Sequence, residues 1–378
     1  MPVDPRKILI QTGDAGLGHR SAAEALQKAF ENQFGDMCEV TINNPLNHPD
    51  IPDIIRQSQS DYDEIVKAIP DLYRLGFDIS DAKLPVSLME SGFNLVLLDV
   101  MRETIAKYQP DLILTTYPIY PAPLTALQES DNLDLPVIAT VTDLVTVHHV
   151  WFHTNLNLLT VPTKIVYQKA LEAGMRHEQM NITGIPVDPA IHYLKDSPVK
   201  DLRRDLGWEE GTTTLLVVGS PRITDLMEIL REIDTSQVVF QFALVAGGND
   251  DLYAKFQSTR WEHPAIIYNF VDYMPRLMRA ADMIICKAGG LIVTESLASG
   301  LPLMLVHVLP GQERGNVDFV LDHDAGALCE SPCEASETLS RWFGNNQAEL
   351  NTIAQNAAGA GRAEAALEIA RIAWGFLN

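Results

Sequence analysis

The sequence predicts a two-domain α/β protein in which each domain holds a parallel sheet covered by helices. With 378 residues, the chain is too long for one ordinary hydrophobic core and suits two domains of common size. Short apolar runs alternate with helical patterns almost throughout, which is typical of parallel strands joined by crossover helices. The alternation stops at a proline-rich passage and then restarts, which predicts one sheet on each side of that passage.

The first half of the chain carries short apolar runs rich in β-branched residues. We expect strands there at residues 7–11, 39–42, 111–115, 137–141 and 158–161. Between these runs, apolar residues recur at helical spacing, and we expect helices at residues 18–34, 50–76, 92–108 and 163–173. Helices between successive strands indicate crossover connections, so the strands of this half are expected to run parallel.

The second half repeats the pattern. We expect strands at residues 214–218, 239–246, 265–268, 283–286 and 303–306, and helices at residues 224–233, 273–280, 290–299 and 315–323. The final segment, residues 361–376, has the spacing of an amphipathic helix. Its apolar side is formed by Ala363, Ala366, Leu367, Ala370 and Ala373.

The proline-rich passage is GIPVDP at residues 184–189, followed by a charged stretch. Proline fixes the backbone and removes an N–H donor, so this passage ends regular strand pairing. We therefore divide the chain into an N-terminal domain, residues 1–186, and a C-terminal domain, residues 187–360. The remaining helix, residues 361–378, is expected to pack back on the N-terminal domain.

The composition excludes several classes of function. Hydrophobic residues make up 46% of the chain and charged residues 21%, which is the balance of a folded soluble protein. The net charge of −22 would repel the phosphates of nucleic acids, so we expect no nucleic-acid partner. The same charge disfavours electrostatic adsorption to an anionic lipid surface.

Cysteine usage and the N-terminal residues favour a cytoplasmic protein. The four cysteines form no CxxC pair, and Cys329 and Cys333 have no nearby histidine or cysteine pair to complete a zinc site. We expect buried free thiols in a reducing compartment. No signal-peptide pattern and no long uncharged apolar run is present in the sequence, so any membrane contact is expected to be peripheral.

A glycine-rich turn, GDAGLGHRS at residues 13–21, follows the first expected strand and opens a helix. Glycines let backbone N–H groups approach a ligand, and a helix N-terminus offers partial positive charge. His19 lies at the carboxyl end of this strand, where an imidazole can act as a general base. The alternatives are tight helix-on-sheet packing for the glycines and a solvated helix cap for His19.

Two further motifs follow strands of the second half. KAGGLIVTES, residues 287–296, brings glycines to the start of a helix, where they permit close approach to a phosphate. Its Glu295 can accept paired hydrogen bonds from ribose hydroxyls, although a solvated helix glutamate is the alternative. LPGQERGN, residues 309–316, places polar side chains where they can hydrogen-bond a sugar or simply cap the next helix.

A fourth motif, TDLVTVHHVWFH at residues 142–153, contains three histidines and two aromatic residues after a strand. His148 and His153 lack the i, i+4 spacing of two ligands on one helix, and no carboxylate pair accompanies them. We therefore predict no metal site. The motif is instead expected to form an aromatic and histidine wall of an acceptor cleft.

Together and in this order, the four motifs resemble glycosyltransferase family 28, and within it the monogalactosyldiacylglycerol synthases and processive diacylglycerol glucosyltransferases. The resemblance covers nearly the whole chain and is strongest at residues 18–26, 142–153, 182–189 and 287–316. It implies the GT-B fold, in which two Rossmann-like α/β domains face a central cleft. It also implies an inverting transfer of glucose or galactose from a UDP-sugar to a lipid such as diacylglycerol.

The resemblance further implies roles for individual residues. His19 would be the catalytic base. The implied donor-binding residues are Ser220, Arg222, Phe270, Val271, Met274, Gly289, Gly290, Thr294, Glu295, Gln312, Glu313 and Asn316. The implied acceptor-binding residues are Gly16, Gly18, Asp143, His148, Trp151 and His153.

The implied partners are a UDP-hexose donor and a lipid acceptor at a membrane surface, with no obligate protein partner. Because the UDP-sugar is a substrate, no cofactor is expected. Together with the absence of a signal-peptide pattern, the lipid acceptor predicts a cytoplasmic enzyme, peripheral on the inner face of the cell membrane.

The chain departs from the family pattern at VGSPRI, residues 218–223, where a glycine-rich loop is usual. Pro221 lacks an N–H donor, and we expect Arg222 to supply a charge to the diphosphate instead. Ile292 also stands where relatives often carry threonine. Two alternatives stay open: a UDP-sugar-binding protein with altered or lost turnover, and a transferase with a non-lipid acceptor. An epimerase-like reaction is disfavoured because the chain combines the GHR and PGQE motifs.

Overall fold

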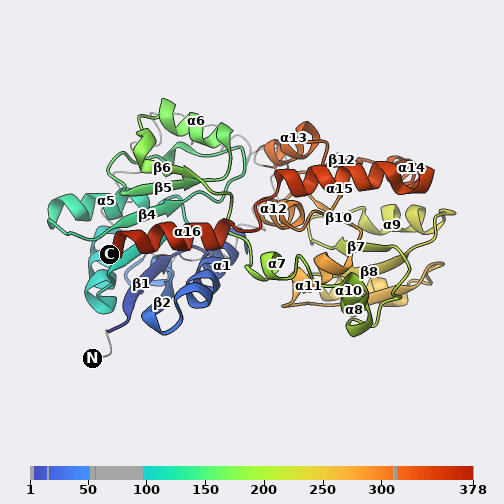
Figure 1. The fold of residues 1–378 in the computed structure, drawn as a ribbon, viewed down its shortest axis with the longest axis horizontal. Coiled ribbons are helices and arrows are strands. Elements are labelled where there is room, and N and C mark those ends of the chain that lie inside the picture. Colours follow the sequence, from blue (N-terminus) through green and yellow to red (C-terminus); the bar gives the residue numbers. More distant parts are fainter. Residues whose placement is uncertain are drawn as a thin grey trace. The chain divides into compact units, whose positions relative to one another are not determined.

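A computed structural model describes residues 4–14, 17–51, 56, 97–309, 311 and 313–377. The chain forms two compact units (Figure 1). The first comprises Met1–Pro189 together with Glu364–Asn378, and the second comprises Ala190–Ala363. The chain therefore passes from one unit to the other at two places in the sequence. The helix expected at residues 50–76 falls almost entirely outside the described residues.

The first unit is built on a six-stranded parallel sheet with the order β2-β1-β3-β4-β5-β6. Its strands are β1 (Arg6–Gln11), β2 (Cys38–Asn43), β3 (Leu112–Thr115), β4 (Val137–Thr140), β5 (Leu158–Val161) and β6 (Met180–Ile182). Every apolar run expected as a strand in this half forms one. The sequence did not predict β6, because three residues with an asparagine in the middle carry too short a pattern.

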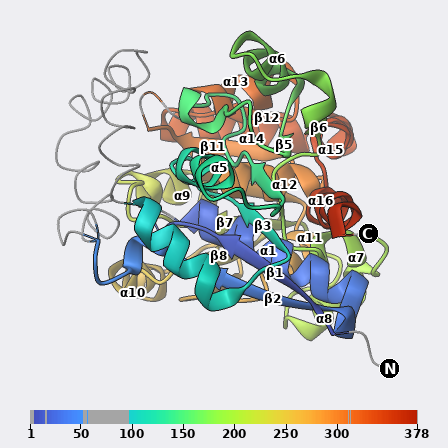
Figure 2. The same cartoon turned by 90° about the vertical axis from the view of Figure 1, so that its left-hand side faces the viewer.

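Helices cover both faces of this sheet (Figure 2). Helices α1 (Leu17–Phe34) and α16 (Ala365–Trp374) pack on one face through small and aliphatic side chains. The helix at residues 97–108, α5 (Pro121–Ser130) and α6 (Lys164–Glu172) pack on the other. The sequence analysis assigned no helix to α5, which begins with proline. Proline is tolerated there because the first turn of a helix has N–H groups without an internal partner.

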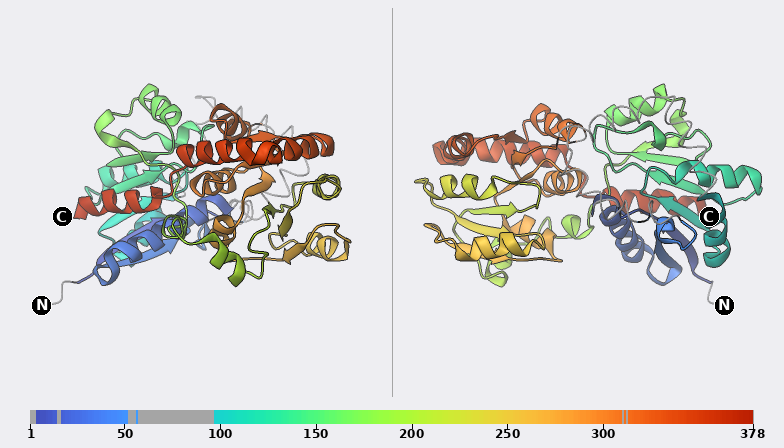
Figure 3. Two further views of the ribbon diagram at one scale, coloured as in Figure 1. Left: turned by 45° about the vertical axis from the view of Figure 1, so that its right-hand side comes forward. Right: turned by 180° about the vertical axis from the view of Figure 1, so that it is seen from behind.

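Helix α16 belongs to the first unit although it follows the second in the chain (Figure 3). Trp374 stacks on Phe34 with ring centroids 4.1 Å apart, and the Gln33 side chain donates to the Leu367 carbonyl oxygen at 2.8 Å. The helix expected at residues 361–376 begins later, at Ala365. It does so because Gly361 ends the preceding helix, α15 (Ala348–Ala360).

The second unit also contains a six-stranded parallel sheet, with the order β12-β11-β10-β7-β8-β9. Its strands are β7 (Thr214–Val218), β8 (Gln241–Val245), β9 (Ala265–Tyr268), β10 (Met283–Lys287), β11 (Leu303–His307) and β12 (Gly326–Leu328). The predicted strands are confirmed, and among the described residues of this unit the three-residue β12 is the one strand that was missed. The prediction of two parallel α/β sheets is therefore correct.

Helices of the second unit are α7 (Ala190–Tyr193), α8 (Val199–Asp205), α9 (Leu226–Asp234), α10 (Asp250–Ser258), α11 (Met274–Ala280), α12 (Gly290–Ala298), α13 (Arg314–Asp322), α14 (Pro332–Phe343) and α15. Of these, α9, α11, α12 and α13 were predicted. Among the described helices of the chain, none combines the length and apolar character needed to cross a membrane. Because both sheets are wholly parallel, the carboxyl ends of all strands in a sheet lie at one edge.

The cysteines are all free thiols. Cys286 and Cys329 are buried, as expected, but Cys38 is only partly buried and Cys333 is exposed. The expectation of buried thiols was therefore wrong for these two. Cys333 lies in the first turn of α14 and its thiol lies 3.5 Å from a carboxylate oxygen of Glu337, one turn further along this amphipathic helix.

Candidate active site

The carboxyl edge of the first sheet collects hydroxyl groups. Thr12, Thr116 and Thr142 lie in the segments that follow β1, β3 and β4. The Thr116 hydroxyl is 2.9 Å from the Thr12 hydroxyl and 2.9 Å from the His19 carbonyl oxygen. These contacts tie the first turn of α1 to the ends of β1 and β3.

His19 lies in that first turn and is partly buried. Its Nδ1 is 2.9 Å from the Thr116 carbonyl oxygen and 2.7 Å from the Thr142 hydroxyl. A carbonyl oxygen can only accept a hydrogen bond, so the neutral ring carries its proton on Nδ1 and keeps a lone pair on Nε2. An imidazole in this tautomer can take a proton from an alcohol at Nε2.

The charge state of His19 is set by opposing influences. Burial lowers the pKa of His19, whereas the negative charge of Asp143 and the Thr116 carbonyl raise it. Asp143 is held by Trp151, whose indole Nε1 donates to Oδ2 at 2.8 Å. Trp151 is 0% exposed, so this hydrogen bond fixes the carboxylate against the core. Three predicted residues thus interact: Trp151 donates a hydrogen bond to Asp143, and the charge of Asp143 acts on His19.

A second group of polar contacts surrounds Asp14 in the glycine-rich turn and includes residues of 117–122, a segment that we expected to form part of the acceptor face; the other segment of that expectation, residues 61–91, lies outside the described residues. The Asn44 side-chain amide donates to Asp14 Oδ2 at 2.7 Å, and Asn44 Oδ1 accepts from the Tyr120 hydroxyl at 2.9 Å. Tyr117 meets His19 edge-on, with ring centroids 4.9 Å apart. Burial and the charge of Asp14 raise the pKa of Tyr117 to about 12, so its phenol stays neutral. Asn44 lies one residue after β2 and Tyr117 two residues after β3. A position directly after a strand is the sequence signal that places both residues at this edge of the sheet.

The remaining predicted acceptor positions differ in their surroundings. His148 Nδ1 accepts from the Val150 N–H at 3.3 Å, which caps a short 3-10 turn. His153 Nε2 is buried and has no hydrogen-bond partner among the described residues, and burial lowers the pKa of this ring. A Cβ on Gly18 would meet nothing within 4 Å, so packing does not require glycine there. Gly16 lies outside the described residues.

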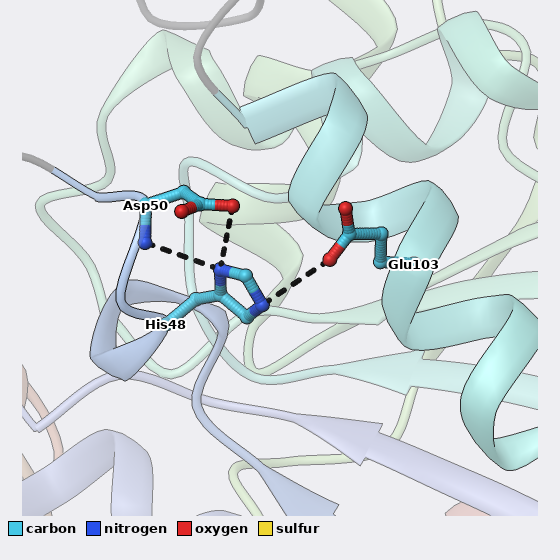
Figure 4. Close-up of side chains that lie close together, drawn as sticks. All are labelled: His48, Asp50 and Glu103. Atoms are coloured by element: carbon cyan, nitrogen blue, oxygen red, sulfur yellow. Dashed lines mark hydrogen bonds and ion pairs between the residues drawn. The ribbon is translucent and has the colours of Figure 1, made fainter.

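Figure 4 shows a separate cluster of His48, Asp50 and Glu103, whose ligand-type atoms lie within 4.8 Å of one another. The Asp50 N–H donates to His48 Nδ1 at 3.3 Å, which leaves the ring proton on Nε2, 3.4 Å from Glu103 Oε2. Both ring nitrogens therefore have protein partners. The cluster links the segment after β2 to the helix at residues 97–108 and needs no metal ion to do so.

Glycines follow three strands at the carboxyl edge of the second sheet. Gly219 follows β7, Gly247 and Gly248 follow β8, and Gly289 and Gly290 follow β10. Gly247 and Gly248 adopt φ of +67° and +80°, and a Cβ on Gly219 would lie 2.4 Å from a leucine side chain. The N-cap residue of α12 is Gly289, which has no side chain to accept from the first N–H groups of the helix, a setting that suits an anion. Only the pair after β8 was not predicted from the sequence.

Two buried side chains of the PGQERGN motif are used inside the second unit. Glu313 is 5% exposed, forms an ion pair with Lys287, and accepts from the Leu309 N–H at 2.9 Å. The Asn316 side-chain amide donates to the Ala288 carbonyl oxygen at 2.9 Å. These contacts hold the turn between β10 and α12 against the start of α13. Lys287 was not among the predicted donor-binding residues.

On helix α12, Thr294 and Glu295 were both predicted to bind the nucleotide. Thr294 is buried, and its hydroxyl donates to the Gly290 carbonyl oxygen at 2.7 Å, one turn earlier. Glu295, the next residue, is only partly buried. The Thr294 hydroxyl is therefore used within α12, whereas the Glu295 side chain is partly exposed. Gln312 lies outside the described residues.

The other predicted donor positions lie in the segments after β7 and β9. Phe270 is 71% exposed, Val271 is buried, and Met274 begins α11. After β7, the Ser220 hydroxyl oxygen accepts from the Arg222 N–H at 3.3 Å, which closes the turn that contains proline. The exposed ring of Phe270 and the Ser220 turn thus belong to the same sheet edge as the glycine turns.

Charged groups gather at this edge around His307, the last residue of β11. Burial lowers the pKa of His307, Glu313 and Asp225 raise it, and Lys287 and Arg222 lower it further. Arg222 and Lys287 therefore both lie within electrostatic range of one imidazole. The edge combines two cationic side chains with the N-terminus of α12, a combination suited to a phosphate-bearing ligand.

Comparison with known proteins connects these two edges to one family. The sequence profile of monogalactosyldiacylglycerol (MGDG) synthase matches residues 19–187, and that of the glycosyltransferase family 28 C-terminal domain matches residues 213–371. A probable MGDG synthase of Glycine max is 33% identical over 380 residues, which is 97% of this chain and 70% of that protein. The chain belongs to the MGDG synthase family.

Other plant members of the MGDG synthase family give the same result. The Spinacia oleracea synthase is 32% identical over 97% of this chain and 72% of its own length. Synthase 3 of Arabidopsis thaliana is 29% identical over 97% of this chain and 80% of its own length. Family membership makes the chain a glycosyltransferase, as predicted. His19 is the first residue of the MGDG synthase match, and Lys287, Glu295 and Glu313 lie in the family 28 match.

Solved structures with the same fold support the GT-B prediction. MurG of Acinetobacter baumannii superposes with a TM-score of 0.62 at 14% identity, covering 98% of this chain and 99% of that one. The UDP-GlcNAc 2-epimerase of Neisseria meningitidis gives 0.62 at 14% identity, covering 98% and 100%. At such low identity the likeness concerns the fold alone. The fold of this MGDG synthase family member is that of the GT-B glycosyltransferases.

Proposed function

We propose that this chain transfers a hexose from a UDP-sugar to diacylglycerol, with inversion at the anomeric carbon. Membership of the MGDG synthase family supports the class of reaction and the acceptor, since its plant relatives are named for that product. The observation that carries the chemistry is His19, whose Nδ1 is committed to the Thr116 carbonyl oxygen at 2.9 Å while Nε2 stays basic.

The reaction needs a base because an alcohol is a weak nucleophile until its proton is removed. In the proposed step, His19 Nε2 takes the proton of the diacylglycerol hydroxyl. The hydroxyl oxygen then forms a bond to the anomeric carbon of the donor, and the bond from that carbon to UDP breaks. UDP leaves with the electron pair. One such displacement inverts the anomeric configuration.

The donor is proposed to bind at the carboxyl edge of the second sheet. Turns with glycine after β7, β8 and β10 let backbone N–H groups approach the diphosphate, and Arg222 adds positive charge. Glu295 accepts hydrogen bonds from ribose hydroxyls, and residues 269–274 frame the uracil. Gln312 contacts the hexose.

The proposed acceptor determines where in the cell the enzyme would act. Diacylglycerol partitions into bilayers, so the enzyme would meet it at a membrane surface. We extend the proposal to a cytoplasmic enzyme on the inner face of the cell membrane, although the plant relatives are named chloroplastic. No metal ion or cofactor takes part in the proposed step.

The test is a transfer assay with purified protein, diacylglycerol in mixed micelles, and either UDP-galactose or UDP-glucose. Mass spectrometry should show diacylglycerol that carries hexose with at least one donor, together with released UDP. UDP release that requires a water-soluble alcohol instead would identify a non-lipid acceptor. Binding of UDP-sugar without release of UDP under any condition would show a binding protein and contradict the proposal.

A further inference from the structure

Lys287, the last residue of β10, carries a charge that the predicted donor site did not include. Its side chain is 18% exposed, and that of its ion-pair partner Glu313 is 7% exposed. Removing two opposite charges from water costs free energy that their mutual attraction only partly returns. A buried pair at the edge of a ligand site therefore suggests a function for one of its members.

The ammonium group lies against the backbone that opens α12. A Cβ built on Gly289 would lie 2.7 Å from Lys287 Nζ and 3.6 Å from Glu313 Oε1. The residue after Gly289 begins α12, whose N-terminus carries partial positive charge and has no side-chain cap among the described residues. Nζ and these N–H groups therefore lie around one turn, and an anion bound there would gain both interactions.

Glu313 has little capacity left for a ligand. One carboxylate oxygen, Oε1, pairs with Lys287, and the other, Oε2, accepts from the Leu309 N–H at 2.9 Å. The residue is 5% exposed. Both oxygens thus already have partners inside the second unit, which favours a role for Glu313 in holding these partners.

We propose that Lys287 contacts the diphosphate of the donor and that Glu313 is a positioning residue that holds the Lys287 ammonium in place. The inference rests on the proposed function, in which the donor is a UDP-hexose. It makes Lys287 part of the donor site and makes Glu313 act through Lys287 and not on the sugar.

The first test replaces Lys287 with methionine, which has a similar length and no charge. Affinities for UDP and a UDP-hexose are measured by calorimetry, and the affinity for uridine by ligand-observed NMR. Lys287→Met should weaken UDP and UDP-hexose binding by about tenfold or more, because a charge-assisted contact is lost, and leave uridine binding within about twofold. Lys200→Met removes an exposed lysine of α8 and is the matched control.

The second test replaces Glu313 with glutamine. Glutamine offers one carbonyl oxygen where glutamate offers two, so either the Lys287 ammonium or the Leu309 N–H loses its acceptor. Glu313→Gln should weaken the binding of UDP and the binding of UDP-hexose by the same factor, about threefold or more. It should cause no further loss in a chain that already carries Lys287→Met, because both changes remove the same interaction.

The double variant also protects the test against misfolding, since it leaves no unpaired buried charge. It should lose UDP affinity as much as Lys287→Met alone. UDP affinity within about twofold of wild type in both Lys287→Met and the double variant would overturn the inference, as would an equal loss for uridine. A Glu313→Gln chain that loses affinity for UDP-hexose but not for UDP would show that Glu313 contacts the sugar, which would contradict the positioning role. A wild-type chain that binds neither UDP nor UDP-hexose would instead overturn the proposed function itself.

Discussion

The two nitrogens of the His19 ring have different surroundings. Nδ1 lies 2.9 Å from the Thr116 carbonyl oxygen and 2.7 Å from the Thr142 hydroxyl, and these contacts hold the ring on α1. The same contacts select the tautomer in which Nε2 is the basic atom. The sequence predicted the histidine from its place in a glycine-rich turn. It contained no signal for the tautomer, which depends on residues that follow two other strands.

Replacing His19 by alanine removes the proposed base. Turnover should fall by about a hundredfold or more, while UDP affinity stays close to that of wild type because the proposed donor residues lie in the second unit. His148→Ala and His153→Ala test the two rival histidines in the same assay. Near-native turnover of His19→Ala would reject the base assignment, and joint loss of UDP binding and stability would make His19 structural.

The pH dependence of the reaction should report the surroundings of His19. The neutral ring is the active base, so kcat/KM falls as the pH falls through the pKa of His19. Burial lowers that pKa from the ordinary value of 6.5, so activity should persist to a lower pH than for an exposed histidine. Asp143→Asn removes a charge that raises the pKa. The acid limb of the profile should therefore move to lower pH, and an unmoved limb or a shift to higher pH would contradict this account.

At the scale of elements, α16 is an integral part of the first unit. Ile369, Ala370 and Ala373 are each 0% exposed and belong to the same apolar cluster as Leu26 and Phe30 of α1. The sequence indicated the apolar side of this helix from its spacing. The surface that it covers was less evident, since it belongs to a helix far earlier in the chain.

Truncating the apolar side of α16 should therefore destabilise the first unit. Ile369→Ala removes a fully buried side chain and should lower the free energy of unfolding by about 2–5 kcal/mol. Arg371→Ala, at an exposed position of the same helix, should change it by less than about 0.5 kcal/mol. Urea unfolding followed by circular dichroism compares the two. Equal stability of both variants would show that α16 adds little to this unit.

The elements that the sequence predicted are those with strong patterns. Strands buried on both faces, such as β3 and β5, read as continuous apolar runs and were located almost to the residue. The three-residue strands β6 and β12 carry no such pattern. In the site, His19, Asp143 and Trp151 followed strands and were predicted. Lys287 and Glu313 form a buried pair between separate elements, which no local pattern reveals.

At the scale of the whole molecule, the net charge is −22. A charge of this size repels anionic surfaces, and the repulsion weakens as salt screens it. A lipid acceptor nevertheless requires contact with a bilayer. Apolar side chains are therefore expected to supply the attraction, and the charge to oppose it.

Vesicle flotation tests this balance. Binding to neutral phosphatidylcholine vesicles that contain diacylglycerol should be at least as strong as binding to vesicles rich in anionic lipid. Moderate salt should leave the neutral-vesicle binding unchanged and should not weaken the anionic-vesicle binding. Tight binding to anionic vesicles that collapses on addition of salt would reveal a local basic surface and contradict this expectation.

The position of α16 in the chain has a consequence for synthesis on the ribosome. Residues 190–363 form an uninterrupted unit, so every element of that unit has been made before translation reaches residue 364. The first unit begins earlier, but the apolar cluster over α1 lacks Leu367, Ile369 and Ala370 until α16 emerges. Domains generally fold as units during translation. Of these two units, the one that holds His19 is thus started before the other and completed after it.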